Sequence, residues 1–310
     1  MNVRMSQNND QLKIRKLWEE VFPEDSKEYL DFYFDIVMQE NSVIVVESEL
    51  TDDTEVVAML HLNPYTVLHG TQQVKIYYVV AVATKKAYRR QGLMRKMLEY
   101  AQELSKKDNI DFLILLPEDE RYYRPFEYEF VSKQYNTTIQ SSKYAYAQIE
   151  TLESKKNLSP LTFHEFREKF TTRSYENENN FVPLRTSKTA YRIYQEISSE
   201  NGQIFSVDGN LIFVYQYEEG GIAKIEVRKV YYKKVETQKE AFDNYDVVKN
   251  FLVMLAKGRL LIVHEVQERK VSKCFSYNRQ NIYDCRPYMM IKKISQTKVV
   301  LENIYFDETV

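Results

Sequence analysis

Glycine is scarce in this sequence, with seven occurrences among 310 residues. Because glycine serves mainly where the backbone needs a conformation that other residues avoid, each of the seven positions needs a structural reason. Gly92 stands in the segment AYRRQGLMRKML, residues 87–98, where the pattern of a strand passes into the pattern of a helix. This segment is therefore the first candidate for a functional site.

Residues that commonly bind metal ions are also few. The two cysteines, Cys274 and Cys285, match no common zinc spacing, and a chain of this size needs no disulfide to hold its fold. The four histidines are scattered along the sequence. We expect two idle thiols and no metal site.

Long apolar runs and an excess of one charge are absent as well. No apolar run approaches the ~20 residues that span a bilayer, and the start, MNVRMSQNNDQLK, lacks the apolar region of a secretory signal. The 43 basic and 45 acidic residues give a net charge of −2, which argues against a general nucleic-acid binder. We expect a cytoplasmic protein with no membrane and no nucleic-acid partner, and the sequence leaves open whether it forms a homo-oligomer.

The first half of the chain has the pattern of an α/β domain. Amphipathic helices are predicted at 11–22 and 24–37, the second with Asp25 or Ser26 as its N-cap. Strands are expected next, at 41–48, 55–65 and 72–84. A third helix begins at Leu93, and the continuous apolar run FLILLP, residues 112–117, indicates a buried parallel strand. Strand, helix and strand together predict a βαβ unit.

A polar, aperiodic segment at 151–160 marks the predicted boundary, with domains at 1–150 and 151–310. The second half begins with helical patterns at 161–170 and 189–197 and continues with strands separated by the hairpin signals Asp208-Gly209 and Gly220-Gly221. A helix that ends at Gly258 and a strand at 259–266 follow. This order resembles that of the first half without obvious sequence identity.

The segment around Gly92 predicts an anion-binding loop. A tight loop between a strand and a helix leaves several backbone N–H groups pointing into one concavity, at the positive end of the helix dipole. Glycine there lets a phosphate approach closely, and Arg89, Arg90 and Arg95 could pair with its oxygens. The loop is neither a P-loop nor the three-glycine dinucleotide fingerprint.

The segment VVAVATKKAYRRQGLMRKML, residues 79–98, resembles motif A of the GNAT (GCN5-related N-acetyltransferase) superfamily. Arg89 and Gly92 match that motif, while Met94 replaces its final small residue. The resemblance implies that the end of the strand hydrogen-bonds the pantetheine arm of acetyl-CoA and that the loop holds its pyrophosphate. The residues implied in cofactor binding are Val82, Ala83, Thr84, Arg89, Arg90, Gln91, Gly92, Leu93, Met94 and Arg95.

A second match to the same superfamily lies downstream, in the segment YRPFEY at residues 123–128. Here Glu127 stands where the family usually has glycine. The resemblance implies that Tyr123 is the general acid that protonates the departing thiolate of CoA. A tyrosine hydroxyl, with an ordinary pKa near ~10, is protonated at neutral pH and can donate.

The whole pattern is similar to the Eis (enhanced intracellular survival) branch, in which an active GNAT domain precedes a degenerate one. This implies an α/β tandem GNAT fold, and the chain is too short for the full sterol-carrier-like third domain of that branch. The resemblance further suggests the C-terminal carboxylate, here on Val310, as a base. No Arg-x-x-Gly segment joins strand and helix in the second half, so one acetyl-CoA site per chain is expected.

The general base and the acceptor are less clearly indicated. The turn near Tyr123 contains five acidic residues: Glu118, Asp119, Glu120, Glu127 and Glu129. They either form a solvated turn or line the entrance of a pocket and attract a cationic amine. His61 is a further candidate base. No Ser/His or Cys/His pair suggests a covalent intermediate, so we predict direct transfer of acetyl from acetyl-CoA to a primary amine of a small molecule or peptide.

Two other functions remain open on the sequence. A catalytically inactive GNAT-fold protein could hold CoA as a sensor or scaffold. A Fem-type aminoacyl transferase also joins two GNAT-like domains, but its tRNA substrate does not suit the neutral charge balance of this chain.

Overall fold

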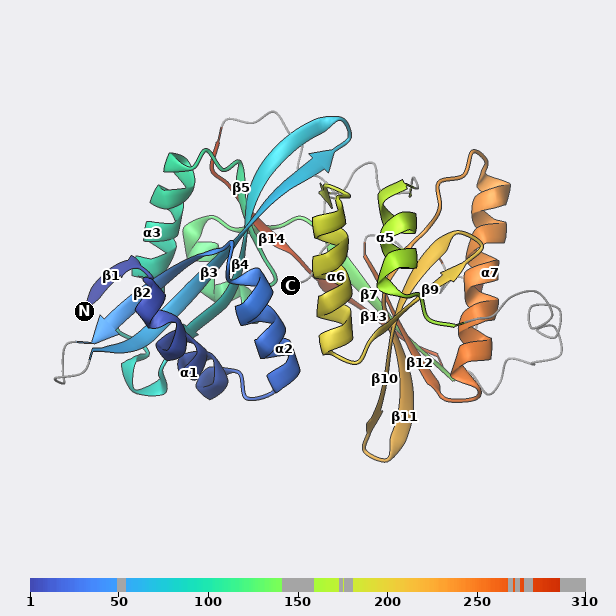
Figure 1. The fold of residues 1–310 in the computed structure, drawn as a ribbon, viewed down its shortest axis with the longest axis horizontal. Helices are drawn as coiled ribbons and strands as arrows, with labels where there is room; N and C mark the ends of the chain where they lie inside the picture. The colour runs from blue at the N-terminus through green and yellow to red at the C-terminus, as the bar shows by residue number, and fades with distance from the viewer. Residues whose placement is uncertain are drawn as a thin grey trace. The chain divides into compact units, whose positions relative to one another are not determined.

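The chain divides into two compact units. A computed structural model describes residues 1–48, 54–140, 159–172, 175, 181–266, 270, 274–275 and 281–295. The first unit contains Met1–Val131 together with the later strands β8 and β14, and the second contains the other described elements (Figure 1).

The first unit is built on a sheet in the order β1-β2-β3-β4-β5-β14-β6, with β8 pairing beside this path with β3. Its strands are β1 Asn2–Met5, β2 Ser42–Ser48, β3 Glu55–His69, β4 Gln72–Thr84, β5 Phe112–Leu115, β6 Glu129–Phe130, β8 Val182–Pro183 and β14 Met290–Lys293. Strands β4 and β5 are parallel, and the other pairs are antiparallel. The strand expected at 72–84 is therefore confirmed residue for residue.

Helices cover both faces of this sheet because the side chains of a strand alternate between its faces. In β2, Ile44 and Val46 join an apolar core with α3 (Leu93–Lys107), whereas Val43 and Val45 join a different core with α1 (Gln11–Val21). The helix expected at 24–37 forms as α2 (Lys27–Phe32), which continues into a π-helical turn, Tyr33–Val37.

The N-cap of α2 is Ser26, one of the two expected candidates. Its Oγ accepts a hydrogen bond of 3.1 Å from the backbone N–H of Tyr29. This bond satisfies one of the donors that a helix start leaves without an intrahelical partner.

The second unit repeats this architecture. Its sheet has the order β13-β7-β12-β11-β10-β9. The strands are β7 Lys133–Gln140, β9 Gln203–Val207, β10 Asn210–Glu219, β11 Ile222–Tyr231, β12 Leu260–Val266 and β13 Ile282–Pro287, and the helices are α5 Phe163–Thr172, α6 Ser187–Ser199 and α7 Gln238–Ala256. Parallel strands β11 and β12 flank α7, as β4 and β5 flank α3.

The hairpins of this second sheet form where the dipeptides predicted them. Asp208 and Gly209 have φ of 47° and 90°, and Gly220 and Gly221 have φ of 59° and 76°. Two successive residues with positive φ are the signature of the tight turn that matches the twist of a hairpin.

Each sheet contains strands from the other half of the chain: β8 and β14 in the first sheet and β7 in the second. Strand β14 pairs with β5 and β6 in the first sheet (Figure 1), and β7 pairs with β12 and β13 in the second. The units therefore separate after Val131, earlier than the expected boundary between residues 150 and 151, because the backbone partners of β7 belong to the second sheet. The polar segment 151–158 lies outside the described residues.

Candidate active site

The two parallel strands of the first sheet separate towards their carboxyl ends. Pairing between β4 and β5 covers only Ile76 to Tyr78, whereas β4 continues beside β3 as far as Thr84. Beyond Tyr78, the edge of β4 faces no other described strand. Its exposed N–H and C=O groups can pair with an extended chain of amides, as the edge of any sheet can. Val82, Ala83 and Thr84, expected to hold the cofactor, lie on this edge.

A β-bulge interrupts β4 at the start of that edge. Met59 of β3 lies opposite Ala83, and His61 lies opposite Val80, so Ala81 and Val82 together oppose one residue. Ala81 has φ of 47°, a left-handed conformation that alanine rarely adopts. Bulges of this kind redirect backbone groups and are frequent beside active sites. Nothing in the sequence signalled this feature, because an alanine within an apolar strand gives no local cue.

The loop after β4 ends at a helix whose N-terminus is open. Gly92 is the N-cap of α3 and, as a glycine, offers that helix no capping side chain. Its φ is 75° and that of Arg90 is 63°, so left-handed residues occur close together in the loop. A Cβ placed on Gly92 would meet no atom within 4 Å. The space beside Gly92 is therefore open, and the first N–H groups of α3, like those of any helix, have no intrahelical partner, an arrangement that suits an anion.

Three arginines surround this helix start, as the sequence predicted. The Nε of Arg89 donates to the carbonyl oxygen of Thr84 at 3.0 Å, which folds the loop back onto the end of β4. Arg90 is exposed and forms no ion pair with any described residue. Arg95 is also exposed, and its ion pair with Glu99 is long, at 4.0 Å. The loop thus carries positive charge that internal carboxylates hardly neutralise.

Two residues after Gly92, Met94 stands where the motif has a small residue. It is half-buried and packs against the apolar core of the first unit. The methionine that replaces a small motif residue therefore packs its side chain against the core.

Tyr123 lies in a turn that packs beside the start of α3. The guanidinium carbon of Arg95 is 5.1 Å from the ring centre of Phe126, in the same turn. Tyr123, Leu93 and the partly buried Val82 belong to one apolar cluster. The turn and the first turn of α3 are thus neighbours, and the edge of β4 contributes to the same apolar cluster.

The ring of Tyr123 contacts a second tyrosine. Its centre is 5.8 Å from that of Tyr128, edge to face. Tyr123 is 8% exposed, and burial raises its pKa to about 12. Tyr128 is 1% exposed, burial raises its pKa further, and its hydroxyl has no hydrogen-bond partner among the described residues. Tyr123 is therefore the one of the two nearer to solvent, and its hydroxyl stays protonated at neutral pH.

Most carboxylates of the acidic turn are paired with cations. Asp119 pairs with Arg121, and Glu120 pairs with Arg124, both at 2.5 Å. The hydrogen bond from Arg121 is the main reason that the pKa of Asp119 lies below its ordinary value. Glu118 and Glu129 are exposed and have no partner among the described residues. The turn is thus less acidic than its sequence suggests.

Glu127 is held by a strand that lies far along the chain. Its carboxylate is 3.0 Å from the Nζ of Lys292 in β14, and the same Nζ donates to the carbonyl oxygen of Phe126 at 2.7 Å. The φ of Glu127 is 64°, which explains why glycine is usual at this position. No feature of the sequence indicates that Lys292 fixes the turn.

His61 lies in a buried polar cluster on the α1 side of the sheet. Its Nδ1 is 3.2 Å from the hydroxyl of Tyr33, which donates to Asn63 at 3.0 Å. Complete burial lowers the pKa of His61 to about 3, so the ring is neutral at physiological pH. Val310, the other proposed base, lies outside the described residues. Among those residues, no group of three His, Cys, Asp or Glu side chains is arranged to hold a metal ion.

Comparison with known families adds an independent finding. Residues 2–131 match the sequence model of the acetyltransferase (GNAT) domain. A comparison with curated protein sequences gave no match. No helix in the described part of the chain is long and apolar enough to cross a membrane.

Several solved structures share the fold of both units. A conserved protein of unknown function from Enterococcus faecalis V583 has 12% identity and a TM-score of 0.71, covering 94% of this chain and 72% of that chain. A GCN5-related N-acetyltransferase from Anabaena variabilis has 13% identity and a TM-score of 0.69, covering 95% and 73%. Eis1 from Mycobacterium abscessus has 9% identity and a TM-score of 0.65, covering 95% and 74%. At these identities the similarity shows a shared fold.

Proposed function

We propose that the protein transfers the acetyl group of acetyl-CoA to a primary amine, because residues 2–131 match the sequence model of the GNAT acetyltransferase domain. The expected tandem GNAT fold, with its similarity to Eis proteins, is confirmed. The observation that carries the proposal is the open N-terminus of α3 beside the unpaired edge of β4.

The residues of this site fit the two parts of the proposed co-substrate. The edge of β4 from Val82 to Thr84 offers backbone groups to the amides of a pantetheine arm. The N–H groups at Gly92 and in the first turn of α3, with Arg89 and Arg90, suit a pyrophosphate. Acetyl-CoA would supply the acetyl group as a thioester, whose C–S bond breaks as the amine nitrogen bonds to the carbonyl carbon.

The chain's own side chains would manage the protons of this exchange. The attacking amine must first lose a proton, and Glu118 and Glu129 are the carboxylates of the turn that have no partner among the described residues. The leaving sulfur takes up a proton or a hydrogen bond, for which the protonated hydroxyl of Tyr123 is the candidate donor. His61 is too deeply buried to meet an amine from solvent.

Binding of acetyl-CoA to the full chain by calorimetry tests the proposed cofactor site. Gly92→Asp should abolish binding, because it places a carboxylate before the open helix start. Gly70→Asp is a matched control, since Gly70 also has positive φ (60°) and open space around it but lies in the β3–β4 turn. Equal affinity in wild type and Gly92→Asp would refute the site.

Catalysis is tested separately, by CoA release over a panel of primary amines. Turnover that depends on one amine class would support the transferase. Tight binding of acetyl-CoA without turnover of any amine would favour the inactive, CoA-binding alternative.

A further inference from the structure

The second unit has a helix start at the position that corresponds to the proposed cofactor loop. Helix α7 follows β11 and precedes the parallel strand β12, as α3 follows β4 and precedes β5. At the start of α7, however, side chains accept hydrogen bonds from the backbone N–H groups. Thr237 accepts from the N–H of Glu240, and the Glu240 carboxylate accepts from the N–H groups of Glu236 and Thr237 at 3.2 and 3.1 Å. A carboxylate thus occupies the place where an anion would bind.

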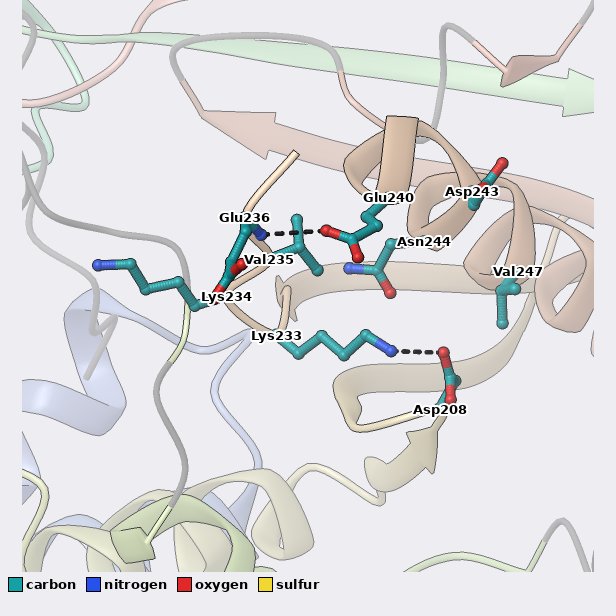
Figure 2. A pocket seen from close by; sticks show the side chains of 9 residues that line it. All are labelled: Asp208, Lys233, Lys234, Val235, Glu236, Glu240, Asp243, Asn244 and Val247. Carbon is teal, nitrogen blue, oxygen red and sulfur yellow. Dashed lines mark hydrogen bonds and ion pairs between the residues drawn. The ribbon is translucent and has the colours of Figure 1, made fainter. Parts of the chain in front are cut away.

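A cavity of about 370 Å³ lies beside this capped helix start (Figure 2). This is far larger than a single water or ion requires. Its lining combines four carboxylates with two lysines: Asp208, Lys233, Lys234, Val235, Glu236, Glu240, Asp243, Asn244 and Val247. The lining is therefore negative overall, which disfavours a phosphate and favours a cation.

One lysine of the cavity forms an ion pair within its lining, and the other extends away from it. Lys233 pairs with Asp208 at 2.6 Å, and Figure 2 shows Lys234 extending away from the other lining side chains. By contrast, the carboxylates of Glu236 and Asp243 form no hydrogen bond or ion pair with the described residues. Glu240 keeps its negative charge, because its hydrogen bonds with Thr237 lower its pKa.

Asn244 supplies an independent sign of a ligand. It is 2% exposed, and its Nδ2 has no hydrogen-bond partner among the described residues. Figure 2 shows this nitrogen directed into the space among the lining residues, between Glu240 and Lys233. An unsatisfied buried donor of this kind destabilises a folded protein.

The orientation of the Asn244 amide follows from its neighbour. Asn210 accepts from the N–H of Lys233 through Oδ1 and donates to the carbonyl oxygen of Val207 through Nδ2. Because that carbonyl can only accept, Nδ2 of Asn210 is fixed, and it also donates to Oδ1 of Asn244 at 2.7 Å. The nitrogen of Asn244 must therefore be the atom that faces the cavity.

We propose that this cavity binds a small organic ammonium compound that also carries a hydroxyl or carbonyl oxygen. The ammonium group meets the carboxylates at the cavity, Glu236 first, and the oxygen accepts from Nδ2 of Asn244. This site lies wholly in the second unit, so its test is independent of the proposed transferase activity.

Three small probes of one shape test the two requirements. Serinol has an ammonium group and two hydroxyls, glycerol replaces the ammonium by a hydroxyl, and isopropylamine lacks both hydroxyls. In the ¹⁵N-labelled full chain, serinol should shift the side-chain NH₂ signals of Asn244. Glycerol and isopropylamine should bind about tenfold more weakly, because glycerol loses the charge-assisted contact with the carboxylates and isopropylamine loses the hydrogen bond from Asn244. Equal binding of serinol and glycerol, or unshifted Asn244 signals, would overturn the proposal.

Variants locate the site on the chain. Glu236→Gln should weaken serinol about fivefold, while Glu218→Gln, an exposed change on β10, should leave it unchanged. Asn244→Leu should weaken it more, and if that variant does not fold, the wild-type Asn244 signals still decide. Serinol binding that survives Glu236→Gln unchanged contradicts the proposed contact. CoA release should be unaffected by Glu236→Gln, which separates this site from the first.

Discussion

At the scale of single residues, the edge-to-face pair of Tyr123 and Tyr128 carries the first prediction. Tyr123→Phe should lower turnover by about 10²-fold, at the low end of the usual contribution of a general acid, with acetyl-CoA affinity unchanged. With a pKa of about 12, ionisation of Tyr123 should cause no loss of rate below about pH 11. Steady-state kinetics and calorimetry measure both effects.

Tyr128→Phe is the matched control for this pair, because it removes the neighbouring hydroxyl with little change of shape. Tyr128→Phe should leave turnover nearly unchanged. Should Tyr128→Phe prove damaging and Tyr123→Phe harmless, the general acid is Tyr128.

The buried His61 predicts a pH-dependent stability. Its folded pKa of about 3 lies below the unfolded value of about 6.5, so the unfolded chain binds more protons as pH falls through this window. Stability from this residue is therefore complete above pH 6.5 and is lost towards pH 3. Between pH 7 and pH 5 the free energy of unfolding should therefore fall by about 2 kcal/mol because of His61.

Urea unfolding of wild type and His61→Phe at both pH values tests this assignment. The phenylalanine retains a ring against Trp18, whose centre is 5.1 Å from that of His61. The variant should be less stable at pH 7, since Tyr33 loses a partner, but should lack the extra acid-induced loss. The same fall in stability in both proteins would show that other groups cause it.

At the scale of elements, strand β14 holds the turn that carries Tyr123. Lys292 of β14 is 9% exposed and bonds both Phe126 and Glu127. Lys292→Met should lower the free energy of unfolding by about 1.5–3 kcal/mol, the usual effect of losing hydrogen bonds to a charged group. It should also lower kcat more than it changes acetyl-CoA affinity, because the turn lies beside the sulfur position proposed above and the open helix start is untouched.

The exposed neighbour Lys293 offers the control on the same strand. Lys293→Met should change the unfolding free energy much less than Lys292→Met. Equal effects of the two changes would mean that the ion pair with Glu127 contributes nothing specific.

At the scale of the whole molecule, the exchange of β7 and β14 links the two units. Strand β7 is the neighbour of both β12 and β13, and β14 that of both β5 and β6. A fragment of residues 1–150 therefore lacks β14 and leaves β7 without its partners. We expect this fragment to have no acetyl transfer activity. Full activity of the fragment on the best amine would show the second half to be dispensable.

A protease site inserted in the segment 151–158 makes the same point without removing any residue. After cleavage, the two pieces should still elute together in size-exclusion chromatography, because each retains a strand in the other's sheet. Separation of the pieces without denaturant would contradict the strand exchange.

Local elements of this fold could be derived from sequence alone. The strand at 72–84, the start of α3 at Leu93 and the turns at Asp208-Gly209 and Gly220-Gly221 depend on periodicity and turn chemistry within a few residues. For the same reason, Gly92 could be identified as the loop residue that directly precedes a helix. These features are set by neighbours in the chain, which a sequence displays directly.

The tertiary structure alone decided which strands and side chains that are distant in sequence lie next to each other. The separation of β4 from β5, the bulge at Ala81 and the pairing of Glu127 with Lys292 depend on partners distant in sequence, the last separated by 165 residues. Strand exchange likewise depends on which edge each strand pairs with, and neither composition nor periodicity encodes that choice. The sequence therefore determined where the site begins, while long-range pairing determined which side chains surround it.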